Sequence, residues 1–210
     1  MRYVRLLSMF LVAHAACTAA CAEEWQELFN GSDLAGWQVV GEQDCWGVSD
    51  GLLSPTAPGG WLSTERAYSD FELSLEFRLA EGSNSGVFLR APHEGRISRT
   101  GMEIQLIDED AEMYRDLQGW QRCGALYHIA EPSIDAFTAA GEWQKLHVRA
   151  AGRKLQVTLN DRLIVDVDLD AFPEMEAEHP GLKRPSGYIG LQNYGGRSID
   201  FRQVRLRELD

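Results

Sequence analysis

Long apolar runs, metal-binding spacings and excess positive charge are all absent from this 210-residue sequence. No segment approaches the ~20 consecutive apolar residues that a transmembrane helix needs. No CxxC or HExxH spacing suggests a zinc site. Lys and Arg number 20 against 32 Asp and Glu, a formal net charge of −12. This balance argues against a nucleic-acid backbone or an anionic membrane as partner, and it is compatible with neutral ligands such as sugars.

Cysteine is also scarce, and only two of the four cysteines, Cys45 and Cys123, fall outside the first 22 residues. An oxidising compartment would permit a disulfide between them. The alternative is a pair of buried thiols. Both interpretations stay open at this stage, because the sequence does not supply the Cα–Cα distance that decides between them.

The first 22 residues have the features of a secretory signal peptide. Arg2 and Arg5 form a basic start, a short apolar run follows, and Ala20-Cys21-Ala22 fits the small-x-small pattern of a cleavage site. We therefore expect cleavage after Ala22 and a secreted or periplasmic protein.

A lipoprotein anchor at Cys17 or Cys21 is the weaker alternative. His14 and Thr18 lie three residues before those cysteines, where a leucine-like residue is expected.

Residues 23–210 are expected to form one β-domain. Helical periodicity is nearly absent, and short extended runs alternate with Gly, Pro, Asn and Asp. Residues 71–79 alternate cleanly between apolar and polar side chains, as a half-buried strand does. Asp50-Gly51 predicts a hairpin turn, and the apolar phase slips near Arg202-Gln203, which suggests a bulge. Many short antiparallel strands predict a sandwich, jelly roll or barrel.

Three predicted strands place polar side chains where they could meet. Alternation puts Glu103 and Gln105 on one face of their strand, and places Arg90 and Gln192 on comparable faces of two others. If the strands share one curved sheet, these side chains converge, and Gly190 leaves room for a ligand. The alternative is an ordinary solvated face, on which Glu103 and Arg90 form a surface ion pair worth at most about 1 kcal/mol.

Aromatic residues near these strands could form the walls of a sugar site. Sugar hydroxyls need partners such as Gln, Glu, Arg and Asn, and sugar C–H faces stack on Trp and Tyr. The candidate walls are Trp61, Trp120, Tyr127 and Tyr194. His128 could be a base, a ligand or an ordinary strand residue.

The acidic run at 108–112, with the sequence DEDAE, could hold a divalent metal such as calcium through several oxygen ligands. Its order does not match an EF-hand loop. A solvated acidic loop is the competing interpretation.

At the candidate site residues described above, the chain resembles the 3-keto-disaccharide hydrolase domain family. The resemblance covers nearly all of residues 23–210 and consists of short motifs in a fixed order. They are ELFNGSDLAGW (27–37), WGVSDGLL (46–53), YSDFELSLEFRL (68–79), GSNSGVFLR (82–90), GMEIQLID (101–108), GALYHI (124–129), GEWQKLHVRAAGRKLQVTLND (141–161), GYIGLQNYG (187–195) and IDFRQVRLREL (199–209).

The resemblance implies a concanavalin-like jelly-roll sandwich of two curved antiparallel sheets, in a bacterial protein that acts on 3-keto glycosides. A 3-keto group acidifies the hydrogen on C2, so one base can start an elimination that water later completes. The implied roles are Glu103 as base or metal ligand, Arg90 and Gln105 as charge-stabilising and orienting groups, and Tyr127 or His128 as acid.

The chain departs from the family pattern after Gln192. Asn193 and Tyr194 stand where the family often has Asp and His, and both remain candidate substrate-binding residues. The departure keeps two alternatives open, a non-catalytic carbohydrate-binding module and a structural or protein-interaction module.

Overall fold

The computed structural model describes residues 24–195 and 198–209. The predicted signal peptide, with Cys17 and Cys21, lies outside the described residues. In the part of the chain that the structure describes, no helix is long and apolar enough to cross a membrane.

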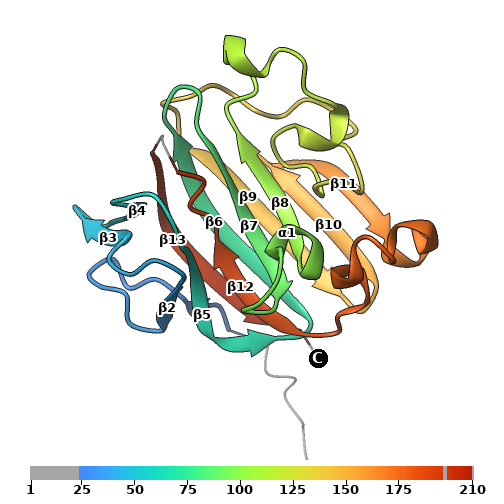
Figure 1. Ribbon diagram of the computed structural model, residues 1–210, viewed down its shortest axis with the longest axis horizontal. Coiled ribbons are helices and arrows are strands. Elements are labelled where there is room, and N and C mark those ends of the chain that lie inside the picture. Colours follow the sequence, from blue (N-terminus) through green and yellow to red (C-terminus); the bar gives the residue numbers. More distant parts are fainter. Residues whose placement is uncertain (1–23, 196–197, 210) are drawn as a thin grey trace, which may run out of the picture.

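Two antiparallel sheets face each other and form a β-sandwich, as the sequence predicts (Figure 1). The eight-stranded sheet has the order β11-β10-β9-β6-β13-β4-β3, with β1 beside β13. Its strands are β1 (Gln26–Glu27), β3 (Trp46–Ser49), β4 (Leu52–Pro55), β6 (Phe71–Leu79), β9 (Gln144–Ala151), β10 (Lys154–Leu159), β11 (Arg162–Asp168) and β13 (Ile199–Glu208).

The five-stranded sheet has the order β2-β5-β12-β7-β8. Its strands are β2 (Trp37–Val40), β5 (Trp61–Tyr68), β7 (Asn84–Ala91), β8 (Met102–Ile107) and β12 (Gly187–Leu191). The core between the two sheets is formed by the apolar half of each alternating strand, such as Leu73 and Leu75 of β6 and Ile104 and Leu106 of β8.

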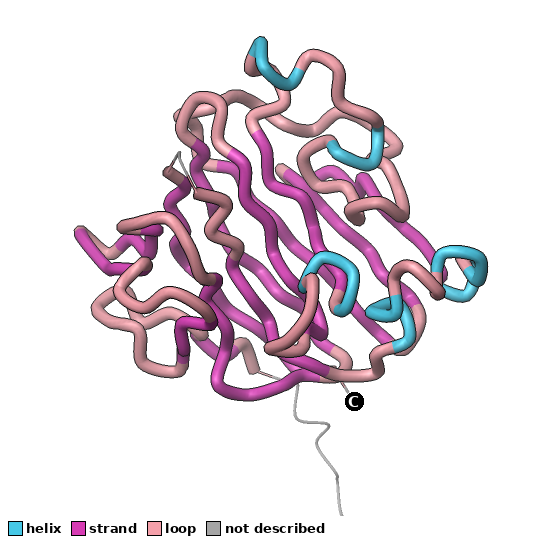
Figure 2. The backbone as a smooth tube through the Cα atoms, viewed as in Figure 1, coloured by secondary structure: helices cyan, strands magenta, loops and turns pink. Residues whose placement is uncertain are grey.

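Helical structure is confined to short pieces at the periphery of the sheets (Figure 2). They are α1 (Ile97–Thr100), η1 (Glu112–Tyr114), η2 (Gly119–Gln121), η3 (Leu169–Ala171), η4 (Pro173–Met175) and η5 (Pro180–Lys183). The helix α1 packs on β7 and β8 and so partly covers the outer face of the five-stranded sheet.

The local turn and bulge predictions are confirmed. Asp50 and Gly51 join β3 to β4 with φ values of 54° and 76°, the left-handed conformation that such a two-residue hairpin requires. In β13 the register shifts between Arg202 and Arg205, and Gln203 has a φ of 52°. The extra residue accounts for the phase slip in the apolar pattern.

Of the two interpretations left open for the cysteines, the pair of buried thiols holds. Cys45 and Cys123 are both free and buried. The Cys45 thiol donates to the carbonyl of Glu42 at 3.0 Å. Burial raises the pKa of the Cys123 thiol to about 12. That thiol therefore stays protonated, and the nucleophilic thiolate is rare at ordinary pH.

A second bulge, in β7, overturns the prediction that Arg90 shares a hollow with Glu103. Phe88 pairs with Gly190 and Ala91 pairs with Tyr188. Between these two pairs β7 therefore contains one more residue than β12. Arg90 has a φ of 48°. The alternation that holds up to Phe88 therefore breaks at Arg90, and its side chain does not line the cavity described below.

Arg90 is instead a buried residue, 1% exposed, that connects several loops through hydrogen bonds. Its guanidinium donates to the carbonyls of Ser69 (2.8 Å), Gly152 (2.9 Å) and Arg184 (3.3 Å) and pairs with Asp70 at 2.9 Å. A fixed planar fork of donors suits such a convergence of oxygen acceptors.

We predict that Arg90→Met destabilises the protein by about 3–5 kcal/mol, because it leaves Asp70 and the carbonyls without their partner. Urea denaturation measures the loss. Arg90→Lys keeps the positive charge but not the planar guanidinium. Its stability should therefore lie between that of the wild type and that of Arg90→Met. A variant that unfolds like the wild type but has lost activity would instead restore Arg90 as a site residue.

Candidate functional site

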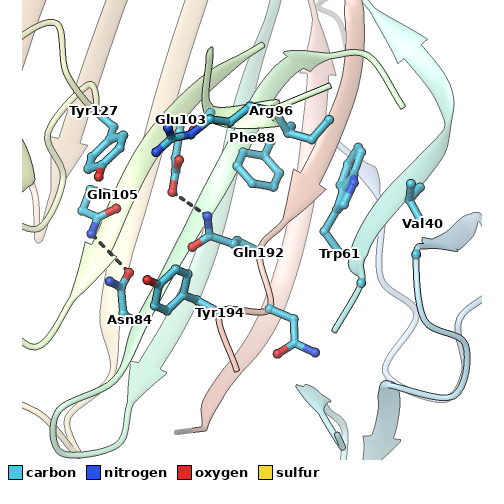
Figure 3. A pocket seen from close by; sticks show the side chains of 15 residues that line it. Val40, Trp61, Asn84, Phe88, Arg96, Glu103, Gln105, Tyr127, Gln192 and Tyr194 are labelled. Atoms are coloured by element: carbon cyan, nitrogen blue, oxygen red, sulfur yellow. Dashed lines mark hydrogen bonds between the residues drawn. The ribbon is translucent and has the colours of Figure 1, made fainter. Parts of the chain in front are cut away.

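A cavity of about 500 Å³ opens on the outer face of the five-stranded sheet, within the range usual for small-molecule sites. Strands β5, β7 and β8 and the residues directly after β12 supply its floor, and Arg96 with the start of α1 supplies one wall (Figure 3). It is lined by Val40, Gly41, Gly60, Trp61, Asn84, Phe88, Arg96, Ile97, Ser98, Glu103, Gln105, Tyr127, Gln192, Asn193 and Tyr194.

Glu103 and Gln105 lie on the cavity face of β8, while Met102, Ile104 and Leu106 enter the core. The two polar side chains are only 2% and 4% exposed, so this is not a solvated sheet face. The residues that follow the long loop after β8 run beside it. Gly124 and Tyr127 donate their backbone N–H groups to the carbonyls of Gln105 and Glu103.

The Glu103 carboxylate lies in a space that only a glycine leaves open. A Cβ added at Gly86 of β7 would collide with that carboxylate. Gln192 Nε2 donates to Glu103 Oε1 at 2.9 Å, the contact that joins β12 to β8 across the cavity floor (Figure 3). Burial raises the pKa of Glu103 to about 8, although the Gln192 hydrogen bond and the charge of Arg96 act in the opposite direction. A base with a pKa near the working pH is suited to proton transfer.

Two further groups face the carboxylate from the same side of the cavity. Arg96 is exposed, and none of the ion pairs between described residues includes it. Tyr127 has its pKa raised by burial and then by the charge of Glu103, so its phenol stays a hydrogen-bond donor. Beyond them Gln105 Nε2 donates to Asn84 Oδ1 at 3.2 Å, which holds both amides at the cavity floor (Figure 3).

The opposite wall is apolar. The Trp61 and Phe88 rings meet edge to face with centroids 5.4 Å apart, and Val40 lies beyond Trp61. The space above Gly190 is taken by the Trp61 ring, because a Cβ added there would collide with it. The prediction that Gly190 leaves room for a ligand is therefore corrected: it leaves room for Trp61.

Asn193 and Tyr194 have different positions in the cavity. Asn193 Nδ2 donates to the carbonyls of Ala57 and Gly59, both at 2.8 Å, and so fixes the loop before β5. Tyr194 is 62% exposed and stands at the cavity mouth. Asn193 therefore anchors a loop, whereas Tyr194 is an exposed part of the cavity lining.

Trp120 and His128 do not line the cavity, contrary to the sequence prediction. Their rings stack on each other with centroids 4.0 Å apart, and His179 lies 5.3 Å from His128. Burial and the neighbouring His179 lower the pKa of His128. Both residues touch the site only through Tyr127, whose ring contacts each of theirs edge to face.

The acidic run at 108–112 does not form a metal cluster. The described residues contain no group of three or more His, Cys, Asp or Glu side chains placed to hold an ion. Asp108 accepts the backbone N–H of Gly82 at 2.7 Å, and Glu109 accepts that of Cys123 at 2.8 Å. Asp108 therefore supports the turn between β6 and β7, and Glu109 supports the loop that runs beside β8.

The sequence analysis missed Val40, Asn84, Phe88, Arg96, Ile97 and Ser98. Alternation along β7 could have found Asn84 and Phe88, because they share a face with Gly86. The segment that holds Arg96, Ile97 and Ser98 has no periodic pattern, and only the fold brings it over β8.

Comparison with known families gives a match over residues 24–207 to the 3-keto-alpha-glucoside-1,2-lyase-like domain. A curated 3-keto-disaccharide hydrolase of Bacteroides thetaiotaomicron is 22% identical over 90% of this chain and 80% of its own length.

Solved structures give the same fold. A Parabacteroides distasonis protein provisionally assigned as a glycosyl hydrolase superposes with a TM-score of 0.79 and 26% identity, covering 89% of this chain and 100% of its own. A carbohydrate-binding module of Bacillus subtilis, CBM66, superposes with a TM-score of 0.56 and 16% identity, covering 82% of this chain and 96% of its own.

The burial of Glu103 generates a prediction about stability. The unfolded chain ionises Glu103 near 4.5 and the folded protein near 8, so the stability that its protonated form contributes is complete below pH 4.5 and lost as the pH rises to about 8. Glu103→Gln cannot ionise. Relative to wild type, this variant should gain on the order of 3 kcal/mol between pH 4.5 and 8.5.

Urea denaturation of both proteins at pH 4.5, 6.5 and 8.5 measures this gain. Asp50→Asn, which replaces a carboxylate by an amide at an exposed turn, serves as the control. An equal difference between Glu103→Gln and wild type at all three pH values would mean that Glu103 titrates normally.

Proposed function

The chain belongs to the 3-keto-alpha-glucoside-1,2-lyase-like family, and on that basis we propose that it cleaves 3-keto glycosides or disaccharides by eliminating the group on C1 and hydrating the product. The observation that carries the proposal is the buried Glu103 carboxylate, with its raised pKa, in a cavity of a size suited to a sugar. The predicted signal peptide supports action outside the cytoplasm, in the periplasm or medium.

Glu103 would act as the base that removes the proton from C2. The electron pair of the C2–H bond moves onto the C3 ketone oxygen and forms an enolate. The enolate then expels the oxygen on C1, which leaves a C1=C2 double bond conjugated with the ketone. Water adds its hydroxyl at C1, its remaining proton neutralises the departed oxygen through solvent, Glu103 returns its proton to C2, and the net reaction is hydrolysis.

Arg96 and Tyr127 would stabilise the enolate oxygen. The role that the sequence analysis gave to Arg90 thus passes to Arg96, which lines the cavity and makes no ion pair with a described residue. A cation and a neutral phenol near the developing charge are the kind of stabilisation that contributes most in a water-poor site. Gln105 and Asn84 would bind hydroxyls of the ketosugar ring.

Because the chain departs from the family pattern after Gln192, we assign proton abstraction to Glu103 alone. Tyr194 stands where a histidine is frequent in the family, and it lies at the exposed mouth of the cavity. Asn193 is occupied by backbone carbonyls. Neither is positioned to act as the base, so a single carboxylate would carry that step here.

A carbohydrate-binding module without catalysis is the second candidate. The superposition with CBM66 supports it, because that module has the same sandwich. A binding module needs no buried acid, and it should bind oxidised and unoxidised sugars alike. Calorimetry with both forms of one disaccharide separates the two functions.

We predict that wild-type protein releases the aglycone from 3-keto-glucosides and that Glu103→Gln lowers kcat at least 10²-fold, the usual contribution of a positioned base. Glu65→Gln makes the same chemical change at an exposed position of β5 that does not line the cavity, and it is the control. Wild-type-like turnover by Glu103→Gln would remove Glu103 from the mechanism.

The raised pKa also predicts a pH profile. The carboxylate must be ionised to accept a proton, so kcat/KM should rise with pH and level off above about 8. Arg96→Met removes a positive charge that lowers this pKa, so it should shift the rising limb to higher pH and lower kcat about 10²–10³-fold. A limb near 4.5 in the wild type would contradict the assignment.

A further inference from the structure

The cavity is divided into a polar and an apolar half, and Glu103 lies at the boundary between them. Tyr127, Gln105 and Asn84 lie on one side of Glu103, and Phe88, Trp61 and Val40 lie on the other (Figure 3). Phe88 is the cross-strand partner of Glu103 in the β7–β8 ladder. The reacting carbon would therefore sit where the two halves meet.

The apolar half is not an exposed part of the main core. Trp61, Phe88 and Ala91 form a separate buried cluster, with Val40, Ile97 and Tyr188 packed against it. The cluster lies on the outer face of the sheet, and four of its members line the cavity. A separate apolar cluster that forms the wall of a polar site is suited to an apolar part of the ligand.

Few groups in this half could bind the hydroxyls of a second sugar. Of the two side-chain amides in the lining after β12, that of Asn193 already donates to backbone carbonyls, and that of Gln192 donates to Glu103 and leaves one acceptor oxygen without a partner among the described residues. His93, behind Trp61, lies within hydrogen-bond distance of Ser63 (2.9 Å) and Gln38 (3.2 Å). Val40, Phe88 and Ile97 carry no hydrogen-bonding side-chain group, and Trp61 carries only its indole N–H, so a sugar ring placed here would gain few partners for its hydroxyls, whereas an aromatic ring would lose little.

The orientation of the substrate follows from the reaction. If C2 faces Glu103 and the C3 ketone faces Arg96 and Tyr127, then C1 points the other way. The group on C1 would lie against Phe88 and Trp61 in the apolar half.

The chemistry of the leaving group points in the same direction. The apolar wall is formed by Val40, Trp61, Phe88 and Ile97, none of which can donate a proton to a departing oxygen as an acid. The C1 oxygen must therefore leave without help from that wall. A phenol, with a pKa of about 10, leaves as a stable phenolate, whereas a sugar alkoxide is far more basic.

We infer that the apolar half is an aglycone subsite for an aromatic ring and that the preferred substrates are 3-keto glycosides of phenols. This inference rests on the proposed function. Glu103 takes the C2 proton, the C1–O bond breaks with its electron pair on the phenolate oxygen, and bulk water protonates the phenolate. Water then adds across the C1=C2 bond to give the free 3-keto sugar.

The test compares three 3-keto-glucosides that carry phenyl, cyclohexyl or glucosyl as the group on C1. The phenyl compound should exceed the glucosyl compound in kcat/KM about 10²-fold. The cyclohexyl compound should have a KM similar to that of the phenyl compound and a lower kcat, because its alkoxide is a poor leaving group.

Two variants locate the effect in the wall. Trp61→Ala should lower kcat/KM for the phenyl compound 10–100-fold and for the glucosyl compound less than about threefold. Val40→Thr is nearly isosteric and should preserve the fold. It should reduce the ratio of kcat/KM for the phenyl compound to kcat/KM for the glucosyl compound. Tyr188→Phe is the control, because Tyr188 belongs to the same cluster but does not line the cavity.

Equal or greater efficiency on the glucosyl compound, or equal losses for both compounds in Trp61→Ala, would overturn the inference and leave the proposed function intact. If no 3-keto-glucoside is cleaved, the proposed function fails. Calorimetry then decides on the subsite: tighter binding of phenyl glucoside than of a disaccharide, lost in Trp61→Ala, supports it, and equal binding of the two overturns it.

Discussion

The site depends on a carboxylate that the fold holds away from water. Glu103 is 2% exposed, its pKa is raised to about 8 by burial, and one hydrogen bond from Gln192 supports it. Such a group lowers the stability of the folded protein progressively as the pH rises from about 4.5 to about 8. No described residue forms an ion pair with it, and retaining it carries a cost that a catalytic base would explain.

The sandwich makes this burial possible because β8 is covered on both faces. Its inner face packs into the core, and its edge pairs with the segment from Gly124 to Tyr127. The segment before α1 then closes the outer face and brings Arg96 over the carboxylate. Gly86 and Gly190 each leave out a side chain, and the vacated space holds the Glu103 carboxylate in one case and the Trp61 ring in the other.

Much of this could be predicted from residue patterns, and the failures have physical causes. Strict alternation correctly placed Glu103, Gln105 and Gln192 on one surface, since strands without bulges keep the two-residue period. It failed at Arg90, because one extra residue in β7 reverses the faces beyond it. The sequence analysis missed Arg96, because an irregular segment has no periodicity that indicates which way its side chains point. Trp120 and His128 were assigned from residue type alone, and type does not decide position.

The most direct test of the central claim observes proton transfer at C2 without any leaving group. Incubation of 3-keto-glucose with the protein in D₂O, followed by NMR, reports exchange of the C2 hydrogen for deuterium. Exchange catalysed by the wild type and by Tyr188→Phe, but abolished in Glu103→Gln, is the predicted result. Exchange that proceeds equally in Glu103→Gln, or no catalysed exchange in the wild type, would contradict the assignment of Glu103 as the base.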